Sequence, residues 1–244
     1  TDDGRIKPDI IANGQALIAT AIPPDCEREE TPCALGDVDQ GGSHYVQMSG
    51  TSMAAPVVTG ALALLNELSM KLRNGAGLRS DEAKAMLIHT AKSPFDGPDY
   101  RIGWGALRAD DAGRLLLSSG PSRSLAEPGE NLKLLHLMAG ETRKVKLRRI
   151  GRSRPRVTLA WLDDPATPEL ELNSATTKLV NDIDIHLIPP DQDGAEPVLP
   201  WALDPTAPRL PALRRSNHRD NVERIDPPVD SAHGQIWTLT INAH

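Results

Sequence analysis

The segment SGTSMAAP, residues 49–56, places serine and threonine hydroxyls directly before a long apolar pattern with helical spacing. A serine hydroxyl is a poor nucleophile unless a base removes its proton and the resulting oxyanion is stabilised. A helix N-terminus meets the second requirement, because free backbone N–H groups and the positive end of the helix dipole lie there. The pattern is therefore suited to a nucleophilic serine, Ser52, at the start of a helix.

The neighbours of this serine fit such a role. Gly50 permits a tight approach, Ala54 and Ala55 keep bulk away, and Pro56 is expected in the first helical turn, where its missing N–H is not needed. Gly60 lowers helix propensity, so we expect a close packing contact at that position. An ordinary Ser/Thr cap on a buried helix is the alternative, and a serine before a helix would by itself favour that alternative.

The whole string Gly-Thr-Ser-Met-Ala-Ala-Pro resembles the nucleophile motif of the subtilisin-like serine proteases (subtilases). GRIKPDIIA, at 4–12, is similar to the strand segment that lies upstream of the serine in that family. TAKSPFDGPDYRIGWGALRADDA, at 90–112, is similar to the segment that closes the catalytic domain, so the resemblance covers about residues 1–115. It implies that Ser52 is the nucleophile of a serine endopeptidase and that its backbone N–H is one oxyanion donor. Gly50, Thr51 and Pro56 are the supporting residues of the motif.

Two features depart from the family pattern. Asn13-Gly14 stands where the family has Pro-Gly. The loop between Thr20 and Tyr45 is longer than in minimal members, and it either shapes substrate access or is a plain insertion. It contains Cys26 and Cys33, which could close a disulfide in an oxidising compartment or be two reduced thiols. A metal site there would need ligands that the loop does not obviously supply.

The activating groups are missing from this chain. The family orders its triad as Asp, His and Ser, and only the serine motif is recognisable. The side-chain oxyanion donor, an Asn, is missing as well. His44 and His89 are poor substitutes, and both fit better as packed or surface histidines.

We therefore expect the C-terminal portion of a subtilase that is inactive in isolation, and a secreted or cell-envelope location. The expected partners are peptide or protein substrates and either the missing N-terminal half of the catalytic domain or a second copy of this chain. The rival hypotheses are a non-enzymatic binding or interaction module and a pseudoprotease scaffold.

The elements that must position this serine change in type near residue 120. Helical patterns cover 52–68, 80–91 and 106–117, and KPDIIA and HYVQM, which precede them, are short and β-like. The second half holds short β-like runs at 132–138, 143–150, 156–162, 182–188, 221–225 and 236–242. Such runs without intervening helices predict an antiparallel sandwich of the jelly-roll kind.

The predicted fold class is a partial α/β subtilisin-like catalytic domain, with an incomplete parallel sheet and helices, followed by an all-β jelly-roll sandwich. The domain boundaries are 1–117 for the catalytic part, 118–130 for a linker and 131–244 for the sandwich. VTLAWLDDP, LVNDIDIHL, PWALDP, HRDNVERI and GQIWTLTINAH occur in this order. The succession resembles the jelly-roll domain that follows the catalytic domain in some bacterial alkaline subtilases, which is related in architecture to the P-domain of proprotein convertases. The resemblance implies that this domain stabilises the catalytic domain or affects substrate access.

Asp182 and Asp184 form a candidate metal site in the second half. Alternation along NDIDIHLI places Ile183, Ile185 and Leu187 on one face of a strand and the two aspartates on the other. Aspartate is disfavoured in strands, and calcium prefers several hard oxygen ligands, so a Ca²⁺ site assisted by Asn181 or Asp163 is one interpretation. A polar solvent-facing strand is the other. No cofactor is required for the peptidase chemistry that the resemblance implies.

Composition excludes other classes of protein. The 39% apolar and 25% charged content are those of a globular chain, and the net charge of −6 argues against a nucleic-acid binder. The exception is a cluster of arginines that we interpret as a solvated strand pair and turn: Arg148, Arg149, Arg152, Arg154 and Arg156. We identify no apolar run of about 20 residues and therefore expect no membrane partner.

Overall fold

The computed structural model describes residues 3–20, 45–119, 131–148, 156–190, 196–227 and 236–244. Contacts divide the chain into two compact units. Unit 1 consists of residues 1–11 and 65–244, and unit 2 consists of residues 12–64.

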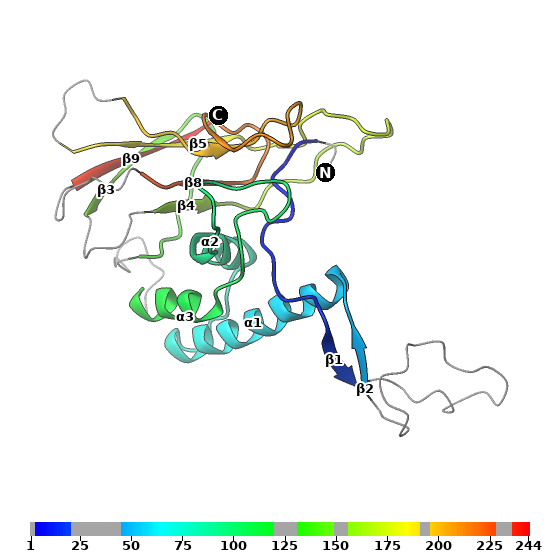
Figure 1. Cartoon of the computed structure of the whole chain (residues 1–244). Helices are drawn as coiled ribbons and strands as arrows, with labels where there is room; N and C mark the ends of the chain where they lie inside the picture. Colours follow the sequence, from blue (N-terminus) through cyan, green and yellow to red (C-terminus); the bar gives the residue numbers. More distant parts are fainter. Residues whose placement is uncertain (1–2, 21–44, 120–130, 149–155, 191–195, 228–235) are drawn as a thin grey trace. The chain divides into compact units, whose positions relative to one another are not determined.

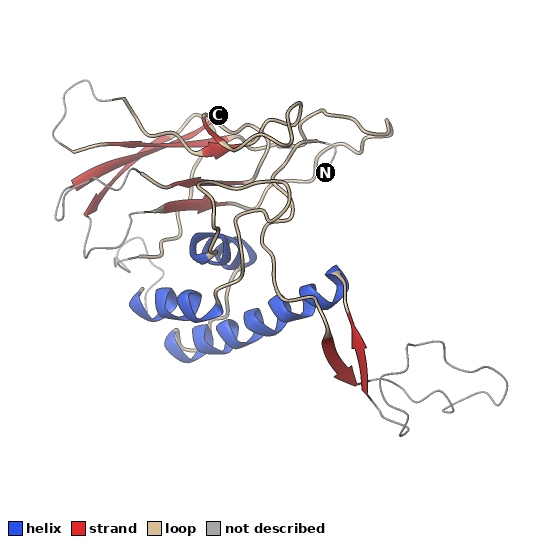
Figure 2. Cartoon of the chain, viewed as in Figure 1, coloured by secondary structure: helices blue, strands red, loops and turns tan. Residues whose placement is uncertain are grey.

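The described residues form three helices and nine strands, which follow one another along the chain (Figures 1 and 2). The helices are α1 (Thr51–Leu72), α2 (Ser80–Thr90) and α3 (Ala109–Ser118). The strands are β1 (Leu17–Thr20), β2 (Tyr45–Met48), β3 (Thr142–Arg148), β4 (Val157–Ala160), β5 (Ile183–Ile188), β6 (Trp201–Ala202), β7 (Leu213–Arg214), β8 (Val222–Ile225) and β9 (Ile236–Ala243). The expected mixed α/β fold, with helices in the N-terminal part and strands in the C-terminal part, is confirmed.

The β-rich part of unit 1 is antiparallel. Strand β9 is the centre of a three-stranded sheet with the order β3-β9-β5, and β4–β8 and β6–β7 form two further pairs. Ile185 lies opposite Ile241 in this sheet, and both side chains are buried in one apolar cluster with Leu187. The alternation predicted for 182–188 is therefore present, because Ile185 and Leu187 face this cluster.

Among the described residues, one expectation about strands is wrong and another is not confirmed. The run 132–138 alternates like a strand but pairs with no other strand there, although Leu135 and Leu137 pack against the apolar cluster of Ile185 and Leu187. An alternating pattern specifies a face but not a hydrogen-bonding partner. The described strands also show neither a closed jelly roll nor a parallel sheet, since the one parallel contact among them is the isolated bridge between Ile11 and Ala106.

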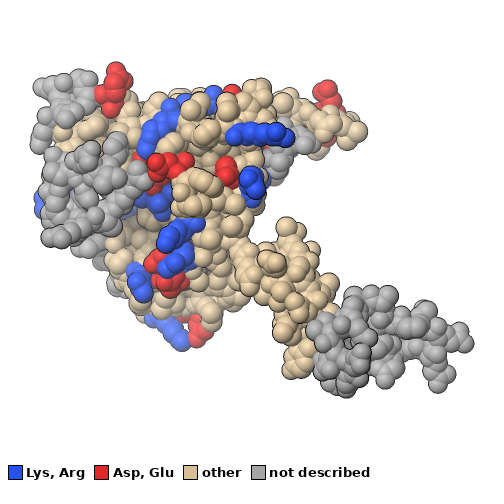
Figure 3. Space-filling model, in the orientation of Figure 1, with Lys and Arg blue, Asp and Glu red and all other residues tan. Residues whose placement is uncertain are grey.

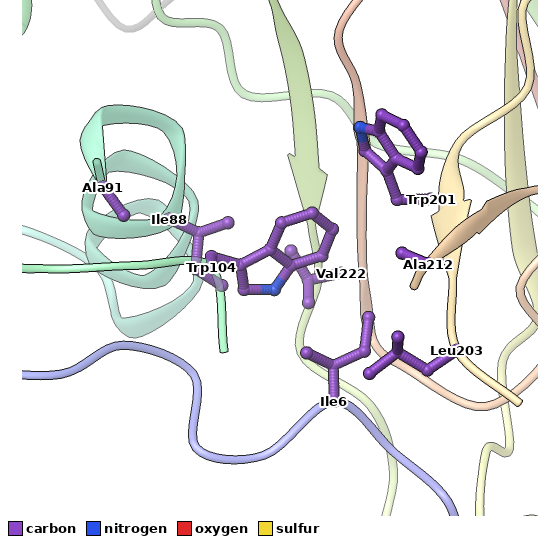
Figure 4. Close-up of a cluster of buried hydrophobic side chains, with 8 residues drawn as sticks. All are labelled: Ile6, Ile88, Ala91, Trp104, Trp201, Leu203, Ala212 and Val222. Atoms are coloured by element: carbon purple, nitrogen blue, oxygen red, sulfur yellow. The ribbon is translucent and has the colours of Figure 1, made fainter. Parts of the chain in front are cut away.

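A second apolar cluster connects segments from both predicted domains (Figure 4). Its members come from the N-terminal segment, α2, the Gly-Trp-Gly turn and the β-rich part: Ile6, Ile88, Ala91, Trp104, Trp201, Leu203, Ala212 and Val222. The predicted linker lies mostly outside the described residues. The helical and β-rich segments of unit 1 therefore share one core rather than two independent ones.

Two glycines allow the backbone to carry Trp104 into this core. A Cβ atom at Gly103 would lie 1.9 Å from the carbonyl oxygen of Pro8, and φ at Gly103 is +57°. A Cβ atom at Gly105 would lie 2.5 Å from the carbonyl oxygen of Lys92, and φ there is +118°. Only glycine fits such close backbone approaches at positive φ. Trp104 between them is fully buried.

Buried ion pairs lie beside the same core. Asp226 accepts hydrogen bonds from Arg156 Nε at 2.6 Å and from Arg224 Nε at 2.9 Å. Arg224 also donates to the carbonyl oxygen of Ile88, in α2, at 3.1 Å. Burial opposes the charged form of Asp226, but Arg224 and Arg156 outweigh it and lower the pKa of this carboxyl group. Arg156, which we expected to be solvated, therefore connects the strand region to a buried carboxylate.

Helix α1 is longer and more apolar than the sequence pattern suggested. It has 22 residues and, among the described residues, is the single helix long and apolar enough to cross a membrane by length and composition. A core helix of a globular protein passes the same test, so this is weak evidence for a membrane segment. Its C-terminal part belongs to unit 1, where a Cβ atom at Gly113 of α3 would lie 3.8 Å from the Leu65 side chain.

We predict that Trp104→Ala lowers the free energy of unfolding by about 3–5 kcal/mol, because it removes the largest fully buried side chain from the shared core. Leu170→Ala is the matched control, since Leu170 is 93% exposed and its loss should cost less than about 0.5 kcal/mol. Urea unfolding followed by circular dichroism measures both values. Equal costs for the two variants would contradict the assigned core.

Candidate active site

Ser52 lies in the first turn of α1, two residues after Gly50, and it is exposed. The Gly50 carbonyl accepts the N–H groups of Met53 at 3.1 Å and Ala54 at 3.2 Å, and these bonds start the helix. Within the described part of the chain, the N–H of Ser52 has no hydrogen-bond partner. A free N–H beside an exposed hydroxyl at a helix N-terminus is the arrangement that an oxyanion requires.

The turn before Ser52 is held by strand β1 and the residues in front of it. Gly50 donates its N–H to the Gly14 carbonyl at 2.8 Å, and Ala16 donates its N–H to Ser49 Oγ at 2.8 Å. Strands β1 and β2 pair antiparallel directly beyond these bonds. A Cβ atom at Gly14 would lie 2.6 Å from the Gly50 carbonyl oxygen, so the glycine of the Asn13-Gly14 pair is the residue that this contact requires.

Pro56 does not lie in the first turn, as we expected from the sequence. Helix α1 begins at Thr51, so Pro56 is its sixth residue. The absent N–H of Pro56 leaves the carbonyl of Ser52 without its usual partner four residues later. The helical hydrogen-bond ladder is therefore interrupted at the candidate nucleophile itself.

The described part of unit 2 contains no group that could activate Ser52. Its residues, 12–20 and 45–64, include no Asp, Glu, His, Lys or Arg. His44, Cys26 and Cys33 lie outside the described residues. A base for Ser52 is therefore absent from the described residues of its own unit.

His89, the other histidine considered as a base, belongs to unit 1. Its ring Nδ1 lies 3.1 Å from Thr158 Oγ1 on β4. Burial, together with the positive charges of Arg156 and Arg224, lowers the pKa of His89 to about 4. The imidazole is therefore neutral at pH 7 and packs between α2 and β4.

Asp182 and Asp184 lie at the start of β5, within reach of two histidines that the sequence analysis did not consider. His218 Nδ1 is 2.7 Å from Asp182 Oδ2, and His244 Nε2 is 3.0 Å from Asp184 Oδ2. Asp163 is engaged elsewhere, since it accepts the N–H groups of residues 180 and 181. No local spacing in the sequence brings the two histidines to the aspartates.

Glu223 lies next to this group on β8. It is fully buried, and its Oε2 accepts the N–H of Ile185 at 2.7 Å. Burial raises the pKa of Glu223 to about 9, and the negative charges of Asp184 and Asp182 act in the same direction. A buried glutamate without a paired cation was not predicted, because only the pairing of distant strands places it there.

Comparison with known proteins supports the serine motif. Residues 1–105 match the model of the subtilase family, Peptidase_S8. The chain is 32% identical to serine protease AprX of Bacillus subtilis over 109 residues, which are 45% of this chain and 22% of that protein. It is 26% identical over 201 residues to the serine protease/ABC transporter B family protein tagA of Dictyostelium discoideum, covering 77% of this chain and 11% of that protein.

The solved serine protease of Aeromonas sobria matches over 82% of this chain and 38% of that structure, with 16% identity and a TM-score of 0.29. This likeness is too low to define the fold. The match to the subtilase family covers residues 1–105 and does not extend to residues 106–244. The chain spans about a tenth to a fifth of the length of the two curated relatives.

We predict that protonation of His89 destabilises the protein in acid. Its folded pKa of about 4 lies below the ordinary value of 6.5, so the stabilisation is complete above pH 6.5 and is lost as the pH falls toward 4. The loss is at most about 3 kcal/mol. His89→Gln should flatten the pH profile of unfolding in this window, whereas the exposed His136→Gln should not. Identical profiles for His89→Gln and the unsubstituted protein would contradict the assignment.

Proposed function

We propose that this chain is the nucleophile-bearing C-terminal portion of a subtilisin-like serine endopeptidase. The observation that carries the proposal is the exposed Ser52 at the start of α1, with a free N–H beside it, within the segment that matches the subtilase family. Ser52 Oγ attacks the carbonyl carbon of a peptide bond in a peptide or protein substrate. The Ser52 N–H and the helix N-terminus stabilise the negative charge that develops on the carbonyl oxygen.

The Asp, the His and the oxyanion Asn come from outside this chain. Strands β1 and β2 and the start of α1 form an uncharged surface in the described part of unit 2 (Figure 3). Its large apolar side chains are exposed, with Ile18 at 68%, Tyr45 at 58% and Leu64 at 69%. A surface with this composition is suited to burial. The proposed occupant is the N-terminal half of the same catalytic domain, and a second copy of this chain is the competing outcome.

The β-rich part of unit 1 acts as a supporting domain in this proposal. Its antiparallel strands and the order of its sequence motifs support a jelly-roll domain of the P-domain type. Through the core around Trp104 it stabilises the helices that follow the nucleophile. A secreted or cell-envelope location accompanies this proposal.

Fluorophosphonate labelling tests the nucleophile. We expect covalent labelling of the full-length protein, no labelling of the Ser52→Ala variant, and full labelling of Ser118→Ala, which removes an exposed serine in α3. The isolated chain should remain unlabelled, because no base is present for Ser52.

Three outcomes contradict parts of this proposal. Equal labelling of the Ser52→Ala variant would show that another residue reacts. Labelling of the isolated chain would show that the base lies within it. A folded full-length protein that is not labelled at all would favour a pseudoprotease scaffold or a binding module.

Gly60 tests whether α1 packs against the missing part. A Cβ atom at Gly60 meets nothing within 4 Å, contrary to the close contact expected from the sequence. In the isolated chain, Gly60→Ala should therefore stabilise the helix by about 1 kcal/mol. In the full-length protein the added methyl group should meet the docked half and lower the melting temperature.

Gly113→Ala is the matched control for this test, because Gly113 lies in α3 and its Cβ would make only ordinary contacts in unit 1. Its effect should have the same sign in the isolated chain and in the full-length protein. If Gly60→Ala stabilises the full-length protein as much as the isolated chain, α1 is not covered at Gly60.

A further inference from the structure

Three side chains with metal-binding atoms converge at the start of β5, and a fourth, His244, lies beside one of them, Asp184. The Asp182, Asp184 and His218 side chains each offer one ligand atom, and these three atoms lie within 4.8 Å of one another. His218 Nδ1 is 2.7 Å from Asp182 Oδ2 and 3.8 Å from Asp184 Oδ2. His244 Nε2 is 3.0 Å from the same Asp184 Oδ2.

The backbone holds these residues together independently of their side chains. Asp182 precedes β5, and its carbonyl accepts the N–H of His244 at 2.9 Å. His244 directly follows β9, whose residue Ala243 pairs with Ile183 of β5. His218 is tied to another loop, because its carbonyl accepts the Thr177 hydroxyl at 2.9 Å. Three separate segments therefore deliver the four side chains to one place.

The contacts with the histidines leave several carboxylate oxygens near this group without hydrogen-bond partners. Asp182 Oδ1, Asp184 Oδ1 and Glu223 Oε1 are buried and have no hydrogen-bond partner in the described structure. Glu223 is fully buried, and its other oxygen is held at the N–H of Ile185, the residue after Asp184. No described Lys or Arg forms an ion pair with any of these three carboxyl groups. Buried carboxylate oxygens without a hydrogen-bond partner are costly.

The histidine–aspartate contacts alone leave these buried oxygens without hydrogen-bond partners. Each imidazole engages one carboxylate oxygen, and three buried oxygens remain unpaired. A divalent cation would compensate the gathered negative charge directly. In a tetrahedral zinc site with bonds of about 2.0 Å, ligand atoms lie about 3.3 Å apart. The observed separations of 2.7, 3.0 and 3.8 Å bracket that value.

We propose that Asp182, Asp184, His218 and His244 bind a divalent transition metal ion of the zinc class. Two imidazole nitrogens and two carboxylate oxygens form a donor set for zinc, whereas calcium and magnesium prefer oxygen ligands alone. Glu223 is not a ligand in this proposal, and its buried carboxyl group lies near Asp184. The sequence alone suggested calcium bound by the aspartates. The present proposal is instead a metal ion that is also bound by both histidines.

The role of this site is structural. Four protein ligands close the coordination sphere of a tetrahedral ion, which is the arrangement of structural zinc sites. The ion would join the start of β5, the residue after β9 and the loop that carries His218. The proposal is independent of Ser52, since every ligand lies in unit 1 and Ser52 lies in unit 2.

Metal titration of the full chain tests the proposal. After dialysis against a chelator, we expect zinc to raise the melting temperature and to bind at one site by calorimetry. Cobalt should give the visible absorption of a tetrahedral complex. His218→Ala and Asp184→Asn should each weaken zinc binding at least about tenfold, because removing a ligand costs no less than removing a group that only orients one. His136→Ala, which removes an exposed histidine outside this group, should bind zinc like the unsubstituted protein.

Circular dichroism of the metal-free variants separates a lost ligand from a lost fold. A folded His218→Ala variant that binds zinc as tightly as the unsubstituted protein would overturn the proposal. Loss of binding in His136→Ala would also overturn it. If the protein bound calcium but not zinc, the zinc-class ion would be rejected, and the site would be a calcium site with oxygen ligands alone. His244→Ala gives a second, independent check, since its side chain can be removed without disturbing the β9–β5 pairing.

Discussion

The burial of Trp104 is the constraint on which unit 1 depends. Its indole lies where the N-terminal segment, α2 and the β-rich part meet. It reaches this buried position only because Gly103 and Gly105 let the backbone approach Pro8 and Lys92. Arg224 lies over the ring, 5.2 Å from its centroid, and donates to the carbonyl of Ile88. Apolar packing and a paired buried charge thus act on the same few residues. The segments before and after the predicted linker are held together by them.

Unit 2 has the opposite physical character. Its described residues carry no charge, yet several of its large apolar side chains are exposed. A segment of this kind gains stability mainly by packing against another surface. The backbone around Ser52 is nevertheless held in place by hydrogen bonds. The Gly50 N–H donates to the Gly14 carbonyl, and the Ala16 N–H donates to Ser49 Oγ. A preformed turn on an incompletely covered segment fits the proposal that the activating groups of Ser52 are supplied by the N-terminal half of the catalytic domain.

The polar group at the start of β5 illustrates how buried charges depend on their neighbours. Asp226 is buried with two arginines, which lower its pKa, whereas burial raises the pKa of Glu223 and the charges of Asp184 and Asp182 act in the same direction. Both residues belong to the same short stretch of β8 and its end. The difference between them is therefore one of surroundings and not of sequence position. A metal ion would remove the difference by supplying the missing positive charge.

The amino-acid sequence by itself determined the local features: three helices, six of the strands, the alternation on β5 and the serine at the start of α1. These depend on residues close together in the chain, where propensity and periodicity act. Sequence patterns failed at 132–138, which lacks a partner strand, and at Pro56, whose place in the helix depends on where the helix begins. Only the tertiary structure joined His218 to Asp182 across 36 positions and His244 to Asp184 across 60. Such contacts follow from strand pairing between distant segments, which no local pattern encodes.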